Sequence, residues 1–120
     1  MARVLSVDDS KVMRDLISSV LTEEGHEVVS AADGMKAMDI ARTENFDLVL
    51  CDINMPGMTG ISLVSKLRRL DHFKFTPIIM VTTETSDYKK EKSKGSGASG
   101  WLAKPFTPER LIAAVNKLVG

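Results

Sequence analysis

The hydrophobic residues of this chain fall into two alternating patterns. Short continuous apolar runs are typical of strands buried on both faces of a parallel sheet, whereas apolar residues that recur every three or four positions are typical of amphipathic helices. The runs that predict strands cover residues 4–7, 27–32, 47–52, 77–82 and 100–104. The second of these runs is weaker than the others and is expected at an edge of the sheet.

Four further segments follow the helical pattern. The first begins after an N-cap at Ser10, stops at Gly25 and directs toward the core Val12, Met13, Leu16, Ile17, Val20 and Leu21. The second opens at Asp33-Gly34 and carries inward Ala37, Met38, Ile40 and Ala41. The third is marked by Ile61, Leu63, Val64, Leu67 and Leu70, and a loop is expected at 71–76. The last is capped by Thr107, starts at Pro108 and is lined by Leu111, Ile112, Val115, Leu118 and Val119.

The order of these elements predicts the fold class. Strands that alternate with helices form a parallel sheet through right-handed crossovers, with helices on both faces, so we expect an α/β domain with a doubly wound five-stranded parallel sheet. The chain has 120 residues, of which 43% are hydrophobic, and this is enough material for one core but not for a second domain. Residues 1–120 are therefore expected to form a single domain with no output domain attached.

Charge and cysteine content exclude several classes of function. Sixteen basic and sixteen acidic residues give a formal net charge of +0, so no overall field favours nucleic acid or an anionic membrane surface. The sequence has neither a signal peptide nor an apolar run long enough to cross a bilayer, which predicts a soluble cytoplasmic protein. The single cysteine, Cys51, allows no internal disulfide and no zinc cluster of thiolates, and its place in an apolar run indicates a small buried side chain.

Polar residues stand at the carboxyl ends of four predicted strands: Asp8, Asp9, Asp52, Thr82 and Lys104. The carboxyl ends of parallel strands share one edge of the sheet, and open α/β sheets bind their ligands at that edge. Clustered carboxylates repel one another unless a cation neutralises them, and a cluster of oxygen ligands suits Mg²⁺. A hydroxyl and an ammonium group beside them could hold phosphoryl oxygens, so the pattern indicates a site that accepts phosphate on Asp52.

Each of these residues also has an ordinary alternative role. Asp52 could cap the loop that follows it, and Asp9 could cap a helix. Thr82 could be present for its β propensity, and Lys104 could be a solvated surface charge. Each such role is common by itself, but the coincidence of these residues at four strand ends favours a shared site.

Four motifs carry a resemblance to a known family. They are Val7-Asp8-Asp9-Ser10, the run Asp52-Ile53-Asn54-Met55-Pro56-Gly57-Met58-Thr59-Gly60, Thr82-Thr83-Glu84, and Lys104-Pro105-Phe106. Together they resemble a response-regulator receiver domain, and the similarity runs from the first strand to the last helix. Among receivers, the chain is most similar to the free-standing chemotaxis regulators of the CheY type. This resemblance implies a flavodoxin-like sheet with the strand order 2-1-3-4-5.

The resemblance also implies a role for individual residues. Asp52 would be phosphorylated by a sensor histidine kinase, and Mg²⁺ would be bound by Asp9, Asp52 and the backbone carbonyl of Asn54, with Asp8 contributing through water. Lys104 would contact the phosphoryl group, and the peptide bond between Lys104 and Pro105 would be cis.

Two residues are implied to carry the switch. Thr82 would form a hydrogen bond with the aspartyl phosphate and move toward it. Trp101 occupies the aromatic switch position, where the family usually has Tyr or Phe; a strand tryptophan with no switching role is the alternative.

The implied function is a phosphorylation-activated signalling switch of a two-component system. Such a protein catalyses only its own phosphorylation and dephosphorylation and is not otherwise an enzyme. Its partners would be the kinase and a downstream protein such as a flagellar motor switch, with no nucleic acid or membrane, and the protein would be a monomer. A phosphorelay receiver or a phosphate sink without a motor target is the alternative.

Two rival functions also fit a polar strand end. A phosphatase of the haloacid dehalogenase type forms an aspartyl phosphate, but it usually has a second acid two residues after the nucleophile, where this chain has Asn54. A flavodoxin-like electron carrier would need backbone donors for the flavin phosphate at the first strand end, where the adjacent acids Asp8 and Asp9 would repel that phosphate. The aromatic content of 5% also leaves few residues to stack on a flavin.

The segment 85–97 departs furthest from the family. A helix is expected there, but only Tyr88 offers substantial apolar surface, and Gly95 and Gly97 each cost about 1 kcal/mol relative to Ala inside a helix. We therefore predict a short, fraying helix. Because this segment has more basic than acidic residues, an acidic partner could order it. An ordinary solvated helix is the alternative.

Overall fold

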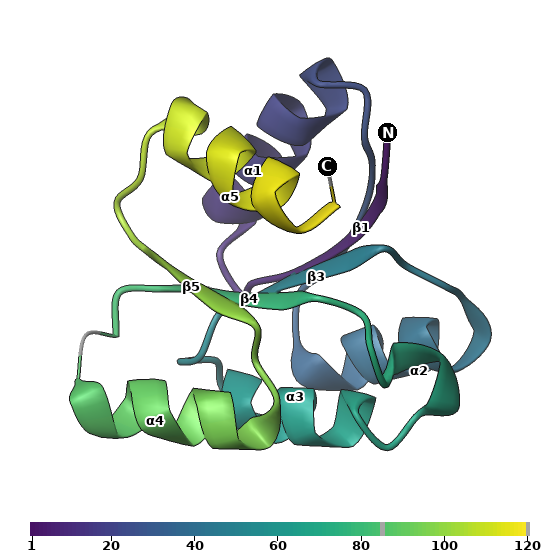
Figure 1. Cartoon of the computed structure of the whole chain (residues 1–120), viewed down its shortest axis with the longest axis vertical. Helices are drawn as coiled ribbons and strands as arrows, with labels where there is room; N and C mark the ends of the chain where they lie inside the picture. Colours follow the sequence, from purple (N-terminus) through teal and green to yellow (C-terminus); the bar gives the residue numbers. More distant parts are fainter. Residues whose placement is uncertain (85, 120) are drawn as a thin grey trace.

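The computed structural model describes residues 1–84 and 86–119, and its elements alternate as the sequence predicts (Figure 1). The strands are β1 Arg3–Val7, β2 Glu27–Ala31, β3 Leu48–Cys51, β4 Ile78–Thr82 and β5 Gly100–Ala103. The helices are α1 Lys11–Glu23, α2 Gly34–Thr43, α3 Gly60–Leu67, α4 Asp87–Ser96 and α5 Pro108–Val119. The expected loop at 71–76 contains one short 3₁₀ turn, Asp71–Phe73, which places the Phe73 ring in the core.

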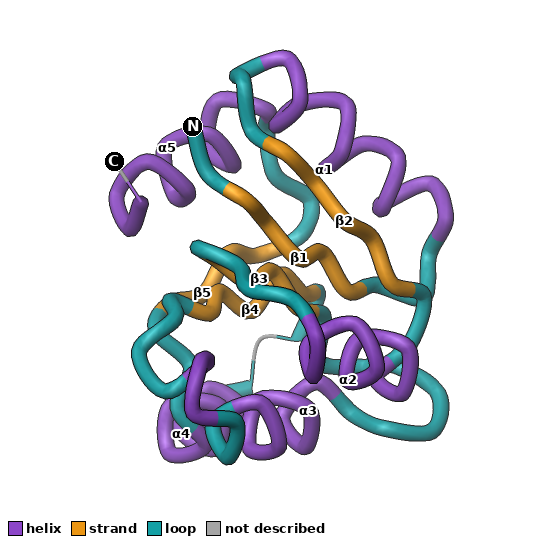
Figure 2. Tube along the Cα trace, turned by 90° about the vertical axis from the view of Figure 1, so that its right-hand side faces the viewer, coloured by secondary structure: helices purple, strands orange, loops and turns teal. Residues whose placement is uncertain are grey.

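All neighbouring strands pair in parallel, in the order β2-β1-β3-β4-β5, so the predicted fold class and strand order are confirmed. Helices α1 and α5 cover one face of the sheet, and α2, α3 and α4 cover the other (Figures 1 and 2). Strand β3 lies in the middle and every one of its four residues is buried, which explains its unbroken apolar sequence. Among the described residues, no helix is long and apolar enough to span a bilayer.

The core is divided by the sheet into two apolar layers. One layer lies under α2 and α3 and includes Met38, Leu63, Leu67 and Phe73. The other lies under α1 and α5 and includes Ile17, Leu21, Leu111 and Val115. Cys51 belongs to the first layer and is fully buried, as its sequence context predicts.

Helix α1 buries a narrower stripe than the sequence predicts. Ile17 and Leu21 are buried, but Val12 is 78% exposed and Leu16 is 39% exposed, so the prediction that both point to the core is wrong. Successive helical residues are rotated by 100°, which spreads the apolar residues of α1 over an arc of the helix surface. Val12 and Leu16 lie at one end of this arc, Ile17 and Leu21 lie at the other end, and the half-buried Val20 lies between the two pairs. The sheet therefore covers only one side of that arc.

Helix α4 forms over ten residues. Tyr88, the one residue of the segment with substantial apolar surface, is 69% exposed, whereas Ser93 is 1% exposed and faces the protein. Ser86 caps the first turn by accepting a hydrogen bond from the backbone N–H of Lys89, and the helix ends at Gly97 in the left-handed conformation, with φ of 112°. Residue 85, the first of the segment predicted to be helical, lies outside the described residues. Fraying of this helix stays a prediction.

Candidate functional site

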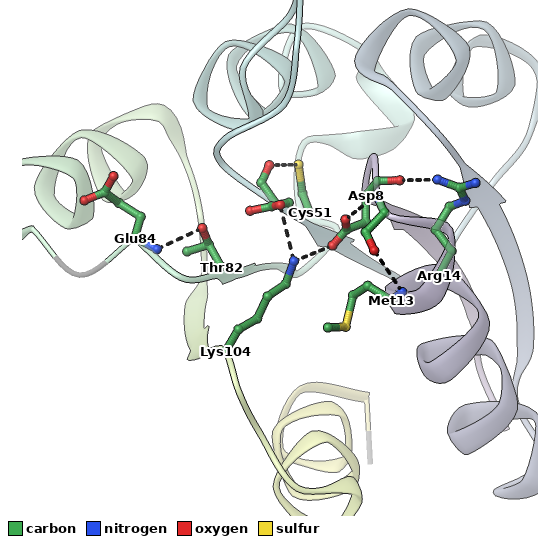
Figure 3. Close-up of polar contacts among 9 residues, drawn as sticks. Asp8, Met13, Arg14, Cys51, Thr82, Glu84 and Lys104 are labelled. Atoms are coloured by element: carbon green, nitrogen blue, oxygen red, sulfur yellow. Dashed lines mark hydrogen bonds and ion pairs between the residues drawn. The ribbon is translucent and has the colours of Figure 1, made fainter.

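Three strand ends bring an ammonium group against two carboxylates at the edge of the sheet (Figure 3). Asp8 follows β1, Asp52 follows β3 and Lys104 follows β5, and both carboxylates are buried. The Nζ atom of Lys104 lies 2.6 Å from Oδ2 of Asp8 and 3.3 Å from Oδ2 of Asp52. The peptide bond between Lys104 and Pro105 is cis, as predicted. The predicted convergence of these strand ends is therefore present.

Asp9 completes a group of three carboxylates. One oxygen from each of Asp8, Asp9 and Asp52 lies within 4.8 Å of the other two. Asp9 is exposed, so the cluster opens to solvent on its side, while Asp8 and Asp52 form its buried floor. An all-oxygen group of this kind matches the ligand preference of Mg²⁺, and the site residues present therefore fit that ion.

The charge of Lys104 is stabilised where it stands. Its side chain is only 12% exposed, and burial by itself would lower the pKa of the ammonium group. The hydrogen bond to Asp8 and the charges of Asp52 and Asp8 outweigh burial, so the pKa of Lys104 is raised above its ordinary value. The charged ammonium group offsets part of the repulsion between the two buried carboxylates.

Glycines allow the loop after β3 to fold tightly around Asp52. The backbone N–H of Gly60 donates to the carbonyl of Ile53 at 2.8 Å, and Gly57 has φ of 79°, a conformation that favours glycine. A Cβ atom on Gly60 would lie 1.9 Å from the carbonyl oxygen of Asp52, a separation that no side chain can occupy. Asn54 is an exposed residue of this same loop. Gly60 thus allows the loop to pack directly against the backbone of Asp52.

Cys51 precedes Asp52 but belongs to the core. Burial is the main cause that raises the pKa of its thiol, with smaller contributions from the charges of Asp52 and Asp8. The thiol therefore stays protonated and is poorly suited to act as a nucleophile.

Thr82 ends the next strand of the sheet, β4, and is fully buried. Its Oγ1 accepts a hydrogen bond from the backbone N–H of Glu84 at 3.1 Å (Figure 3). The Glu84 carboxylate in turn accepts from the backbone N–H of Ser86 at 3.1 Å, and this bond is the main reason that the pKa of Glu84 is lowered. Thr82 is therefore bonded toward the start of α4 rather than toward Asp52.

Trp101 lies in β5, half-buried beneath α4. The Nζ atom of Lys90 sits 5.4 Å from the centre of the indole ring. The indole Nε1 is buried and has no hydrogen-bond partner among the described residues. Trp101 also lines a cavity of about 260 Å³ whose other walls include Lys90, Ser93 and Lys94 of α4. The indole is therefore in contact with side chains of α4.

One residue of the site was missed by sequence reasoning. Arg14 donates from Nη1 to the backbone carbonyl of Asp8 at 2.7 Å (Figure 3). With the bond from the N–H of Ser10 to Oδ1 of Asp8, at 2.9 Å, it fixes the acid from two directions. The sequence marked Arg14 only as a basic residue one helical turn after Ser10, the N-cap that follows Asp8 and Asp9.

Comparison with known proteins agrees with this geometry. Residues 4–116 match the family described as the response regulator receiver domain. The chain belongs to this family. This receiver is 37% identical to the chemotaxis protein CheY homolog of Campylobacter jejuni, over 98% of the chain and 92% of that protein. It therefore acts by phosphorylation-activated signalling in a two-component system.

Solved structures give the same result. The receiver is similar to chemotaxis protein CheY4 of Vibrio cholerae, with 47% identity and a TM-score of 0.95 over 98% of both chains. It also matches the receiver domain of the sensor histidine kinase PA1611 from Pseudomonas aeruginosa, with 28% identity and a TM-score of 0.91, over 99% of this chain and 98% of that one. That structure has a magnesium ion coordinated in its active site cleft.

Proposed function

We propose that this receiver is a switch of the CheY type in which Asp52 is the phosphoacceptor. The observation that carries the proposal is the position of Asp52: it directly follows the central strand, with its carboxylate 3.3 Å from the Lys104 ammonium and two further acids in the same cluster. A sensor histidine kinase supplies the phosphoryl group. A carboxylate oxygen of Asp52 attacks phosphorus, the bond from phosphorus to the kinase imidazole breaks, and the imidazole leaves with that electron pair.

Three side chains and one backbone group are proposed to hold Mg²⁺. Asp9, Asp52 and the backbone carbonyl of Asn54 bind the ion, and Asp8 contributes through water. When bound, Mg²⁺ neutralises the negative charge that gathers as phosphate approaches three carboxylates. The ordered contacts of Asp8 with Lys104 and with the N–H of Ser10 support an indirect role for Asp8, because its oxygens already have partners.

Lys104 and Thr82 are proposed to bind the phosphoryl group once it is attached. The Lys104 ammonium is within reach of Asp52 and keeps its charge, so it can pair with a phosphoryl oxygen. The Thr82 hydroxyl turns toward the phosphoryl group and releases the N–H of Glu84 that it now holds. Trp101 and α4 then change their contacts.

The proposed output is binding of a downstream protein in the cytoplasm, for which a flagellar motor switch is the candidate. Phosphorylation-dependent capture decides between an output partner and a phosphate sink. A protein retained by the phosphorylated receiver and released from the unphosphorylated one supports an output, and capture of the kinase alone supports the sink.

Intact mass spectrometry tests the phosphoacceptor. Wild-type receiver incubated with acetyl phosphate and Mg²⁺ is expected to gain one phosphoryl group, and Asp52→Asn or removal of Mg²⁺ by a chelator is expected to abolish the gain. Mg²⁺ binding can be measured by Trp101 fluorescence. Asp9→Ala should weaken this binding more than Asp8→Ala does. An unmodified wild-type mass, or a gain that persists in Asp52→Asn, contradicts the assignment.

A further inference from the structure

Helix α4 is held to the domain without an apolar face. Its buried residue among those described is Ser93, whose hydroxyl donates to the carbonyl of Lys89 within the same helix at 2.9 Å. Helices in proteins draw most of their stability from packing of apolar side chains, which α4 provides only weakly. The attachment of α4 must therefore come largely from its two ends.

The C-terminal end of α4 is bound by one guanidinium group. Arg68 follows α3 and donates from Nε at 3.2 Å and from Nη2 at 2.7 Å to the carbonyl of Gly97, the residue that ends α4. Its Nη1 donates to the carbonyls of Phe73 at 2.5 Å and Thr76 at 2.7 Å. One side chain thus joins the end of α3, the loop before β4 and the end of α4. The planar fork of arginine makes this set of contacts possible, and a lysine ammonium could not span it.

The shape of the chain at Gly97 is matched to this contact. Gly97 has φ of 112°, and a Cβ atom there would lie 2.9 Å from Nε of Arg68. The absence of a side chain at Gly97 therefore both permits the left-handed turn and leaves room for the guanidinium against the carbonyl. The four hydrogen bonds that Arg68 makes to described residues all end on backbone carbonyls, so the residue acts on the path of the chain rather than on another charge.

The N-terminal end of α4 is attached differently. Thr82 is linked to Glu84, and Glu84 is linked to Ser86, by single hydrogen bonds of 3.1 Å each. Ser86 is exposed and caps α4. This end is therefore tied to Thr82 through two single hydrogen bonds, whereas the other end is held by the guanidinium group of Arg68.

We propose that Arg68 is a positioning residue of the switch. It fixes the C-terminal end of α4, so that reorientation of Thr82 moves the N-terminal end of the helix about a fixed point and changes the contacts over Trp101. This role rests on the proposed phosphorylation of Asp52. Without Arg68, the site still takes up phosphate, but α4 is no longer held in one place and the change at Thr82 is not converted into a defined movement.

The test compares Arg68→Lys with Arg69→Lys. Arg69 is the exposed neighbour of Arg68, and its variant makes the same arginine-to-lysine replacement, so it serves as the matched control. Hydrogen exchange is measured on the unphosphorylated proteins. Loss of hydrogen bonds made by a charged donor should speed exchange in residues 90–97 by roughly tenfold or more in Arg68→Lys. Exchange in α1 and α5 should stay close to wild type in both variants, which separates loss of the Arg68 hydrogen bonds from general unfolding.

The second measurement follows the switch itself. Arg68→Lys should gain the phosphoryl mass from acetyl phosphate as wild type does, but the accompanying change in Trp101 fluorescence should fall to less than half, while Arg69→Lys keeps both. Equal protection of residues 90–97 in the two variants, or a normal fluorescence change in Arg68→Lys, overturns the proposal. An unmodified wild-type mass overturns the proposed function and the switching role with it, and hydrogen exchange alone then decides whether Arg68 anchors α4.

Discussion

Replacement of Gly60 by alanine should lower the stability of the protein far more than the addition of one methyl group would suggest. The added Cβ would lie 1.9 Å from the carbonyl oxygen of Asp52, and 2.8 Å from both the carbonyl carbon of Asp52 and the Cα of Ile53. All three atoms are backbone, so no side chain can rotate away to make room. The chain must instead shift at the end of β3, which is where the phosphoacceptor stands.

The cost can be worked from these contacts. Overpacking that forces a backbone shift costs about 1–3 kcal/mol. The displacement also strains the hydrogen bond from Gly60 to Ile53, and its loss adds about 1 kcal/mol. The expected destabilisation is about 2–4 kcal/mol, which at about 2 kcal/mol per M of urea lowers the unfolding midpoint by about 1–2 M.

Gly95→Ala is the matched control. Nothing lies within 4 Å of a Cβ at Gly95, which is inside α4, so alanine should stabilise that variant by up to about 1 kcal/mol through helix propensity. Urea unfolding followed by the single tryptophan, Trp101, measures both variants, and intact mass after acetyl phosphate treatment measures the site. Equal midpoints for Gly60→Ala and wild type would refute the steric argument, and normal phosphorylation of the variant would refute its link to Asp52.

Three other predictions concern the site and its surroundings. Lys104→Ala should fold with lower stability, because two buried carboxylates lose their counter-charge, and it should take up phosphate but show a reduced Trp101 fluorescence change. A normal fluorescence change on phosphorylation would exclude a coupling role for Lys104. The Cys51 thiol, which is fully buried and has a raised pKa, should resist a thiol reagent at pH 8 in the folded protein and react at once in urea, and rapid labelling without denaturant would contradict its burial. Glu84 has a lowered pKa because the backbone N–H of Ser86 donates to its charged form, so this contact stabilises the folded state above pH 4.5. The stabilisation is lost as the pH falls through the pKa that Glu84 has in the folded state. An NMR titration of the carboxyl carbon with a midpoint at or above pH 4.5 would contradict this prediction.

The sequence was most informative where one local signal determines both structure and position. The apolar run of β3 gives a buried strand, and the polar residue that ends it, Asp52, must then lie at the carboxyl edge of a parallel sheet. The same reasoning placed Asp8 and Lys104 correctly, because parallel strands bring their ends together whatever their separation along the chain.

It was least informative where the outcome depends on which surface another element covers. Val12 and Leu16 have the spacing of core residues, but the sheet reaches only the far side of their arc. Tyr88 is the largest apolar residue of its helix, yet that helix turns Ser93 toward the protein. The contacts of Arg68 could not be predicted at all. They end on backbone carbonyls up to 29 residues away, and every residue type has a backbone carbonyl, so the sequence does not indicate which ones Arg68 contacts.

The division of the apolar core into two layers also bears on how this protein can diverge. Packed layers on opposite faces of a sheet share few side-chain contacts, and substitutions at sites without shared partners combine nearly additively. Leu67 and Val115 lie in different layers, so a double variant of the two should show almost no epistasis in its free energy of unfolding. Substitutions in the layer on the α4 side should therefore leave the contribution of the opposite layer to the free energy of unfolding nearly unchanged.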